Sequence, residues 1–243
     1  MDKFTAEFIG TALLITLGDG VVANVVLNKS KGHNAGWIVV ATGWGLAVAL
    51  GVYCVGTFSG AHLNPAVTLG MASIGKLAWS AVPGYIAAQM AGAFVGAVLV
   101  WLAYLPHWKE TSDTGAKLGV FCTAPGIRRP MANVLCEIIG TFVLVLGVLA
   151  ILTPKNLSPD HGFDTGLGPL LVGLLVLSIG VSLGGPTGYA INPARDLGPR
   201  IAHALLPIHG KGGSDWSYAW VPVLGPVIGG VLGALFYRAF WPA

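Results

Sequence analysis

The stretch GYAINPARD, residues 188–196, is a polar island in a chain dominated by Leu, Val, Ile and Gly. Asparagine suits a helix N-cap and proline suits the first helical turn, so a helix is predicted to begin at Asn192. Arg195 and Asp196 follow within its first turn, although charged side chains are costly beside lipid. The stretch therefore predicts a helix whose charged first turn belongs to a functional site.

The composition places this stretch in a membrane protein. Of the 243 residues, 54% are hydrophobic and only 9% are charged, whereas soluble domains carry about 25% charged residues. We therefore expect a multi-pass protein of the cell membrane. The net charge of +3 gives no reason to expect a nucleic-acid partner. Cys54, Cys122 and Cys136 show no metal-ligand spacing, and we expect no metal, no cofactor and no catalytic residue.

Six stretches are apolar and long enough to cross a bilayer core of about 30 Å, which needs about 20 residues. They are residues 4–27, 36–56, 83–104, 131–152, 166–183 and 217–240. The polar stretches between them are predicted loops, namely residues 28–34, 106–117, 124–130, 153–164 and 206–216. Residues 59–76 and 188–203 are moderately apolar but too short to span. The fold class is therefore an all-α membrane protein with six transmembrane helices and two re-entrant half-helices.

An internal repeat relates the two short segments. SGAHLNPAVT (59–68) matches TGYAINPARD (187–196), with Asn64 and Asn192 lying 128 positions apart. At the same offset Gly45 matches Gly173. Near the start of each half, AEFIGT (6–11) matches CEIIGT (136–141). The chain is interpreted as a single domain, residues 1–243, with repeats at about 1–105 and 131–243 joined by a loop, 106–130. Three spans is an odd number, so the second repeat must enter the membrane from the opposite side.

An inverted repeat of this kind places both short helices at a translocation site. Broken helices that end near the membrane midplane mark such sites in transport proteins. Non-helical backbone survives at that depth only inside protein or along a water-filled cavity, so residues 59–63 and 187–191 have carbonyls free to face a pore. Two helix N-termini that meet there disfavour a cation and favour a neutral, hydrogen-bonding solute.

The paired motifs HLNPAV (62–67) and AINPAR (190–195), in a six-span inverted repeat, resemble the aquaporin or major intrinsic protein family over about residues 4–240. Asp196 after Arg195 resembles the glycerol-facilitator, or aquaglyceroporin, branch found in bacteria. The resemblance implies a passive channel for glycerol and other small neutral solutes, with some water, that excludes ions and protons. It also implies a homotetramer in the lipid bilayer with one pore per monomer. The twin motifs are Asn64, Pro65 and Ala66, and Asn192, Pro193 and Ala194.

The resemblance also implies a selectivity filter made of Trp44, Gly180, Tyr189 and Arg195. Water-selective members typically replace the Trp and Gly with Phe and His, so this filter is expected to be wide and amphipathic. The two rings would carry the CH edge of a polyol while the arginine donates to its hydroxyls. Glycerol facilitators usually carry phenylalanine at the position of Tyr189, and the added hydroxyl is expected to offer a donor and an acceptor. Protonated lactic acid, urea, dihydroxyacetone or mainly water therefore remain alternative solutes.

The remaining residues are assigned around this pore. Two ladders of backbone carbonyls are expected from Gly60, Ala61 and His62 and from Gly188, Tyr189 and Ala190. Val48 and Val176, at equivalent repeat positions, are candidates for the apolar wall. By resemblance Glu7 and Glu137 brace the re-entrant loops, and Asp196 is assigned to loop bracing because helical geometry points it away from the pore. The His62 side chain is expected to bond neighbouring backbone, and Asp19 has no counterpart in the second half and receives no role.

Rival functions make different demands on the sequence. A coupled secondary transporter would need an intramembrane carboxylate placed for ion binding, and only Asp19 is unassigned. A membrane-embedded enzyme would need a metal site or a nucleophile–base pair, and the spans show neither. A cation channel is disfavoured by Arg195 and by the two helix dipoles.

The orientation rests on the resemblance, which implies that both termini are cytoplasmic. That arrangement leaves four basic residues inside, namely Lys3, Lys76, Lys155 and Arg238. It places nine outside, namely Lys29, Lys31, Lys109, Lys117, Arg128, Arg129, Arg195, Arg200 and Lys211. The positive-inside rule opposes this distribution.

Overall fold

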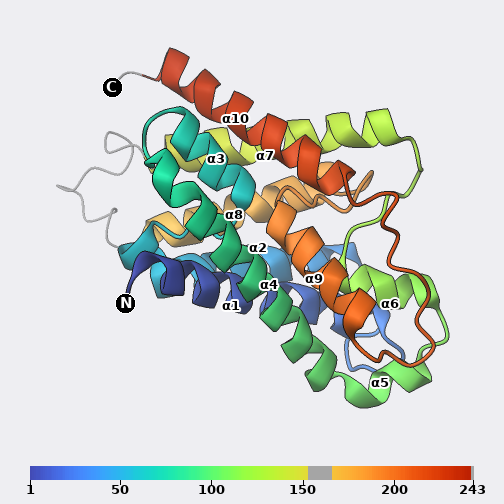
Figure 1. Cartoon of the computed structure of the whole chain (residues 1–243). Coiled ribbons are helices and arrows are strands. Elements are labelled where there is room, and N and C mark those ends of the chain that lie inside the picture. The colour runs from blue at the N-terminus through green and yellow to red at the C-terminus, as the bar shows by residue number, and fades with distance from the viewer. Residues whose placement is uncertain (153–165, 242–243) are drawn as a thin grey trace.

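Six long helices dominate the computed structural model, which describes residues 1–152 and 166–241 (Figure 1). They are α1 (Lys3–Val26), α2 (Trp37–Ser59), α4 (Val82–Ala103), α7 (Pro130–Ile151), α8 (Leu167–Leu183) and α10 (Val221–Phe240). Five of them, with α4 extended by the 3-10 turn η1 (Trp79–Ala81), are apolar and long enough to cross a membrane, and α8 is a shorter apolar helix of 17 residues. The six predicted spans are confirmed, and the predicted loop 153–164 lies outside the described residues.

Two half-helices lie between the long ones, α3 (Pro65–Ser73) and α9 (Pro193–Leu205). Each begins inside the bundle, directly after an asparagine N-cap, and the two run towards opposite ends of the molecule (Figure 1). Proline at the first position of each helix costs no hydrogen bond, because that N–H has no partner within the helix. The two predicted re-entrant segments are therefore confirmed.

Helix packing follows the repeat. In the first half α1 packs against α2 and α4, and in the second half α7 packs against α8 and α10. The halves are joined crosswise, since α3 contacts α10 and α9 contacts α4. The repeat-related glycines Gly45 and Gly173 face each other where α2 crosses α8: a Cβ added at either would lie 2.7 Å or 2.5 Å from the carbonyl oxygen of the other. Larger residues there would push apart the two helices that flank the half-helices.

Both chain termini lie at one end of the bundle, as six crossings require (Figure 1). The outward faces of the long helices carry exposed large apolar side chains, among them Leu46, Leu135 and Leu232. Such a surface suits lipid and not water. The protein is therefore a multi-pass membrane protein.

The predicted loop 106–130 differs from the structure. It contains two short helices, α5 (Leu105–Glu110) and α6 (Thr114–Phe121), at the end of the molecule opposite the termini (Figure 1). Asp113 starts α6 by accepting hydrogen bonds from Gly115 N at 2.8 Å and Ala116 N at 3.1 Å. The segment is polar because it lies outside the membrane-spanning helices, and its short length hides any helical periodicity in the sequence.

Candidate functional site

The two half-helices are joined through their N-cap asparagines. Asn64 Nδ2 donates to the carbonyl of Ile191 at 2.7 Å, and Asn192 Nδ2 donates to the carbonyl of Leu63 at 2.8 Å. Each Oδ1 accepts from a backbone N–H in its own first turn, at 2.8 Å in α3 and at 3.0 and 3.2 Å in α9. An amide nitrogen carries two hydrogens, so each asparagine keeps a second donor after this cross-link.

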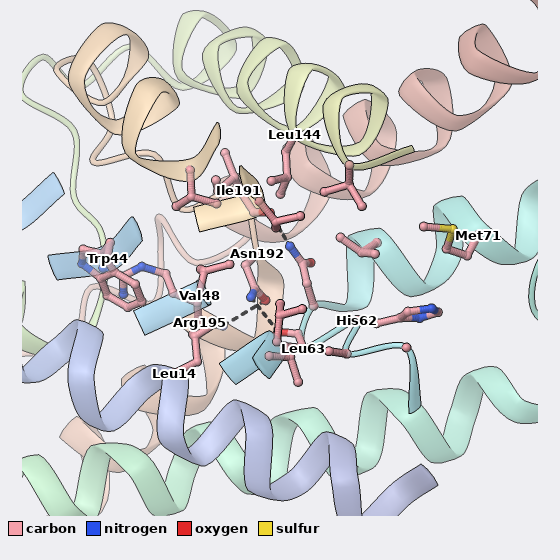
Figure 2. Close-up of a pocket in the computed structure, with 18 of the residues that line it drawn as sticks. Leu14, Trp44, Val48, His62, Leu63, Met71, Leu144, Ile191, Asn192 and Arg195 are labelled. Atoms are coloured by element: carbon pink, nitrogen blue, oxygen red, sulfur yellow. Dashed lines mark hydrogen bonds between the residues drawn. The ribbon is translucent and has the colours of Figure 1, made fainter. Parts of the chain in front are cut away.

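The same two asparagines line a cavity of about 300 Å³, the inner cavity. Figure 2 shows Trp44 at one end of it, His62 and Met71 at the other, and Asn192 between them. Much of the lining of the inner cavity is apolar and includes Leu14, Val48, Val52, Leu144, Val148 and Val176. The predicted wall residues Val48 and Val176 thus lie where the repeat placed them.

The backbone before each half-helix is held in an unusual conformation. Left-handed φ angles recur at repeat-related positions: 82° and 81° at Gly60 and Gly188, 48° and 40° at Ala61 and Tyr189, and 51° and 42° at Leu63 and Ile191. A non-glycine residue in this region costs about 1–3 kcal/mol and persists only when its surroundings hold it. Gly60, Ala61, His62 and Ala190 line the inner cavity, while Gly188 lines a second cavity.

Two buried carboxylates hold these strained segments. Glu7 on α1 accepts hydrogen bonds from His62 N at 2.9 Å and Leu63 N at 2.7 Å, and also from Ser59 Oγ and Gln89 Nε2. Glu137 on α7 accepts from Ala190 N at 3.0 Å and Ile191 N at 2.8 Å. Both glutamates are at most 1% exposed. Each carboxylate therefore accepts backbone donors that the extended chain would otherwise leave without partners.

The His62 side chain differs from its prediction. Its Nδ1 lies 3.2 Å from Thr68 Oγ1, a side-chain hydroxyl on α3, and its ring packs on Tyr85 with centroids 5.0 Å apart. Thr68 also receives a hydrogen bond from Gln89. Within residues 1–152 and 166–241 the expected bond to neighbouring backbone does not form, because the Thr68 hydroxyl in the first turn of α3 takes the ring nitrogen instead.

Three of the four predicted filter residues lie where two cavities meet. Trp44, Tyr189 and Arg195 line both the inner cavity and a second, outer cavity of about 640 Å³. The Arg195 guanidinium lies 4.2 Å from the centre of the Trp44 ring and donates to the carbonyl of Phe121 at 3.3 Å. An aromatic face and a charged donor thus border the passage between the cavities, which we name the constriction.

Gly180 lies behind the constriction and not on its surface. A Cβ added at Gly180 would be 2.7 Å from Cζ and 2.8 Å from the hydroxyl oxygen of Tyr189, so the glycine makes room for that ring. The Trp37 indole donates to the Gly180 carbonyl at 2.9 Å and meets Tyr189 edge-on. The Tyr189 hydroxyl is buried, and within residues 1–152 and 166–241 nothing hydrogen-bonds it. The Tyr189 hydroxyl was expected to offer a donor and an acceptor to the solute. It is instead buried, because the ring that carries it lies against Gly180.

Asp196 points away from both cavities. It accepts hydrogen bonds from the backbone N–H and the hydroxyl of Thr123, at 2.8 and 2.7 Å, and pairs with Arg200 at 2.8 Å. Arg200 in turn donates to the carbonyls of Thr123 and Ser214. The sequence reasoning missed Arg200, although its (i, i+4) spacing from Asp196 on one helix signals such a pair.

The outer cavity is more polar than the inner one. Asn28, His33, Asn34, Thr111 and Asp113 are among its lining residues. Lys29, which follows Asn28, hydrogen-bonds Glu110, which precedes Thr111. This hydrogen bond and the charge of Lys29 lower the pKa of the Glu110 carboxyl. Within the described ranges, no three His, Cys, Asp or Glu side chains cluster in a way that could hold a metal ion.

Known proteins match this chain over nearly its whole length. The family model described as major intrinsic protein matches residues 1–237. A probable glycerol uptake facilitator protein of Thermotoga maritima is 68% identical, with 98% of this chain and 99% of that protein covered. The glycerol uptake facilitator protein of Bacillus subtilis is 61% identical, with 98% and 85% covered. The X-ray structure of the aquaglyceroporin from Plasmodium falciparum superposes with a TM-score of 0.82 at 33% identity, over 98% of this chain and 95% of that one. The chain therefore belongs to the major intrinsic protein family and has the aquaporin fold.

Proposed function

We propose that this protein is a passive membrane channel for glycerol and other small neutral solutes, with some water, and that it excludes ions and protons. The observation that carries the proposal is the constriction, where Trp44 and Tyr189 present aromatic surface and Arg195 presents charged donors between two cavities. Glycerol has the matching character, because its hydroxyls lie along one edge and its CH groups along the other. The names of the Thermotoga and Bacillus relatives agree with this solute.

Beyond the constriction, the inner cavity offers partners for each part of the solute. Its apolar lining residues accept the CH edge, with Val48 and Val176 among the contacts. The hydroxyls meet the carbonyls of residues 60–62 and 190 and the second amide hydrogens of Asn64 and Asn192. A solute that loses its water must find replacement hydrogen bonds, because each unpaired buried polar group costs about 1–3 kcal/mol. Neutral polyols satisfy this path and bare ions do not.

Two features support exclusion of cations and protons. The N-termini of α3 and α9 meet at the paired asparagines and direct the positive ends of two helix dipoles at the middle of the path. Arg195 adds charged donors at the constriction. In aquaporin-type pores, an arginine and the positive ends of half-helix dipoles form electrostatic barriers to protons and cations.

A coupled transporter is less consistent with the site. Coupling needs a carboxylate that an ion can reach, yet Glu7 and Glu137 are occupied by backbone donors. Asp19 lines neither the inner nor the outer cavity and is wholly buried. These placements favour passive diffusion.

We further propose a homotetramer with one pore per monomer and with both termini in the cytoplasm. Both proposals rest on the family. Chemical cross-linking in native membranes tests the tetramer. For the termini, a tag is added at the C-terminus and protease is applied to vesicles; a cytoplasmic C-terminus predicts that the tag is cleaved only after the vesicles are opened. The location of both termini at one end of the bundle supports a shared side, and the distribution of Lys and Arg argues against the cytoplasmic one.

Stopped-flow light scattering on proteoliposomes tests the function. Vesicles shrink in a glycerol gradient and re-swell as glycerol enters, and empty liposomes give the background. Fast re-swelling with a weak temperature dependence supports the channel. Fast water efflux without glycerol entry would instead indicate a water channel, and replacing glycerol with urea, dihydroxyacetone or lactic acid at low pH separates the alternative solutes.

A further inference from the structure

Asp19 is a buried carboxylate that the function above does not use. It lies on α1 with an exposed fraction of 0% and lines neither cavity. Its neighbour Gly18 is pressed against the constriction, since a Cβ added at Gly18 would lie 2.2 Å from the Trp44 ring. This part of α1 therefore forms the backing of the constriction.

The nearest charge to Asp19 belongs to the filter. Arg195 Nη1 lies 3.5 Å from Asp19 Oδ1. Over residues 1–152 and 166–241, no group donates a hydrogen bond to either carboxylate oxygen. A buried carboxylate without hydrogen bonds is costly unless a nearby cation compensates it, so the position of Arg195 and the charge of Asp19 depend on each other.

The Arg195 guanidinium has only neutral partners besides Asp19 among its described contacts. These are the Phe121 carbonyl at 3.3 Å and the face of the Trp44 ring at 4.2 Å. The adjacent Asp196 is paired with Arg200 at 2.8 Å, where both side chains are fully buried. The four charges thus form two neutral pairs, and Asp19 is the charge that balances the filter arginine.

The repeat shows that this pair exists on one side only. The repeat-related position of Arg195 is Val67, and that of Asp19 is Leu149. Both are buried apolar residues, 7% and 3% exposed. Of the two sites that the repeat makes equivalent, one therefore holds both the carboxylate and the arginine, and the other holds neither.

We propose that Asp19 is a specificity-determining positioning residue that draws the Arg195 guanidinium towards α1 and balances its charge from behind the constriction. This inference rests on the proposed function. A charge attraction without a hydrogen bond biases the guanidinium away from the passage and leaves its N–H groups available to a solute. Without Asp19, only one carbonyl and one ring hold the guanidinium, and it extends into the passage. Glycerol, which is larger than water, then loses more permeability than water does.

The test is the ratio of glycerol to water permeability in proteoliposomes containing Asp19→Asn. The ratio does not depend on how much channel is incorporated, so a loss of folded protein alone leaves it unchanged. We expect the ratio to fall by about fivefold. Asp2→Asn is the matched control, because it removes an acid from the same helix at an exposed N-cap where asparagine serves equally well. An unchanged ratio in Asp19→Asn would overturn the inference.

A double-variant cycle keeps the inference testable if Asp19→Asn alone does not fold. Arg195→Val and Arg195→Val/Asp19→Asn are compared for yield of monodisperse protein and for the permeability ratio. Removing both charges together should restore yield relative to either single variant, and the second substitution should no longer alter the ratio. A further change of the ratio in the absence of Arg195 would contradict the proposal. Failure of the proposed function is distinct, because it appears as a wild-type protein that conducts water and no glycerol.

Discussion

The two re-entrant segments, residues 59–73 and 187–205, share a backbone and differ in chemistry. Both carry left-handed φ angles at the same three repeat positions, and in both the asparagine that caps the half-helix donates to the opposite segment. The side chains that follow diverge, since Val67 and Thr68 in α3 correspond to Arg195 and Asp196 in α9. The shared part builds the middle of the cavity, and the divergent part places a charged constriction at one end.

This difference teaches that the symmetric and asymmetric residues have separate tasks. A fully symmetric chain would place the same side chains at both mouths. Here Ala61 lines the inner cavity at the position related to Tyr189, so only one end receives an aromatic ring. Selectivity therefore depends on the residues that break the repeat, and stability of the strained loops depends on those that keep it.

The largest effect is expected from the two glutamates, Glu7 and Glu137, that hold the re-entrant segments. Glu7 accepts from four groups, two of them backbone N–H, whereas Glu137 accepts from the backbone N–H groups of Ala190 and Ile191. Replacing either by Gln turns an acceptor into a donor that faces another N–H. Glu7→Gln should lower the free energy of unfolding by about 3 kcal/mol and Glu137→Gln by about 2 kcal/mol, since each hydrogen bond to a charged group contributes about 1.5–3 kcal/mol.

These losses correspond to falls in the melting temperature of roughly 10 °C and 5 °C for a chain of this size. Size-exclusion chromatography of detergent-solubilised protein after heating measures them. Asp2→Asn, which preserves an exposed N-cap on α1, should leave the melting temperature unchanged. Equal and small shifts for both glutamates would show that the loops hold their conformation without the carboxylates.

Making α9 resemble α3 is the next largest change. Arg195→Val reproduces Val67 and leaves Asp19 as an unpaired negative charge beside the constriction. A unit charge about 4 Å away contributes about 4 kcal/mol at an effective dielectric constant of 20, so the barrier to cations should fall by enough for an increase in leak of about tenfold or more. A potassium-selective electrode outside loaded proteoliposomes measures the leak. A variant that stays as tight to potassium as the wild type would show that the helix dipoles suffice.

Gly180→Ala tests the aromatic ring that only one of the two segments carries, because it should move the ring of Tyr189. The added Cβ would lie 2.7 Å from Tyr189 Cζ, so the ring must shift towards the passage. Glycerol permeability should fall by about fivefold, about 1 kcal/mol of barrier, with a smaller fall for water. Gly185→Ala is the control, because a Cβ there meets nothing within 4 Å. Equal falls for glycerol and water would point to a loss of folded channel and not to a narrower passage.

Much of this arrangement was predictable because the repeat makes distant residues equivalent. The 128-residue offset between Asn64 and Asn192 predicts two half-helices that meet, and the structure places them within hydrogen-bonding contact of each other's segments. The apolar spans were predictable from length and hydropathy alone. Trp44 and Gly180 came from family resemblance, since neither has a local signal that distinguishes it from other span residues.

Other features were not predictable, because they depend on tertiary contacts between residues without a repeat relation. Asp19 and Arg195 lie 176 positions apart on helices from different halves, and no spacing rule relates them. The placement of Gly180 behind a ring follows from how α8 packs and not from its residue type. The short helices α5 and α6 were missed because six or eight residues are too few to show a helical period.

Tyr189→Phe should have the smallest effect, and it decides how the asymmetric half selects its solute. The hydroxyl is buried against Gly180 and, in the part of the chain that the structure describes, has no hydrogen-bond partner. Removing it changes neither the ring edge that lines both cavities nor the contact with Trp37. The ratio of glycerol to water permeability should therefore change by less than about twofold, and the melting temperature should stay equal or rise, because an unpaired buried hydroxyl costs free energy. A large fall in the ratio, measured beside Gly180→Ala in the same liposome preparation, would mean that the ring leaves its slot during permeation and that the hydroxyl contacts the solute.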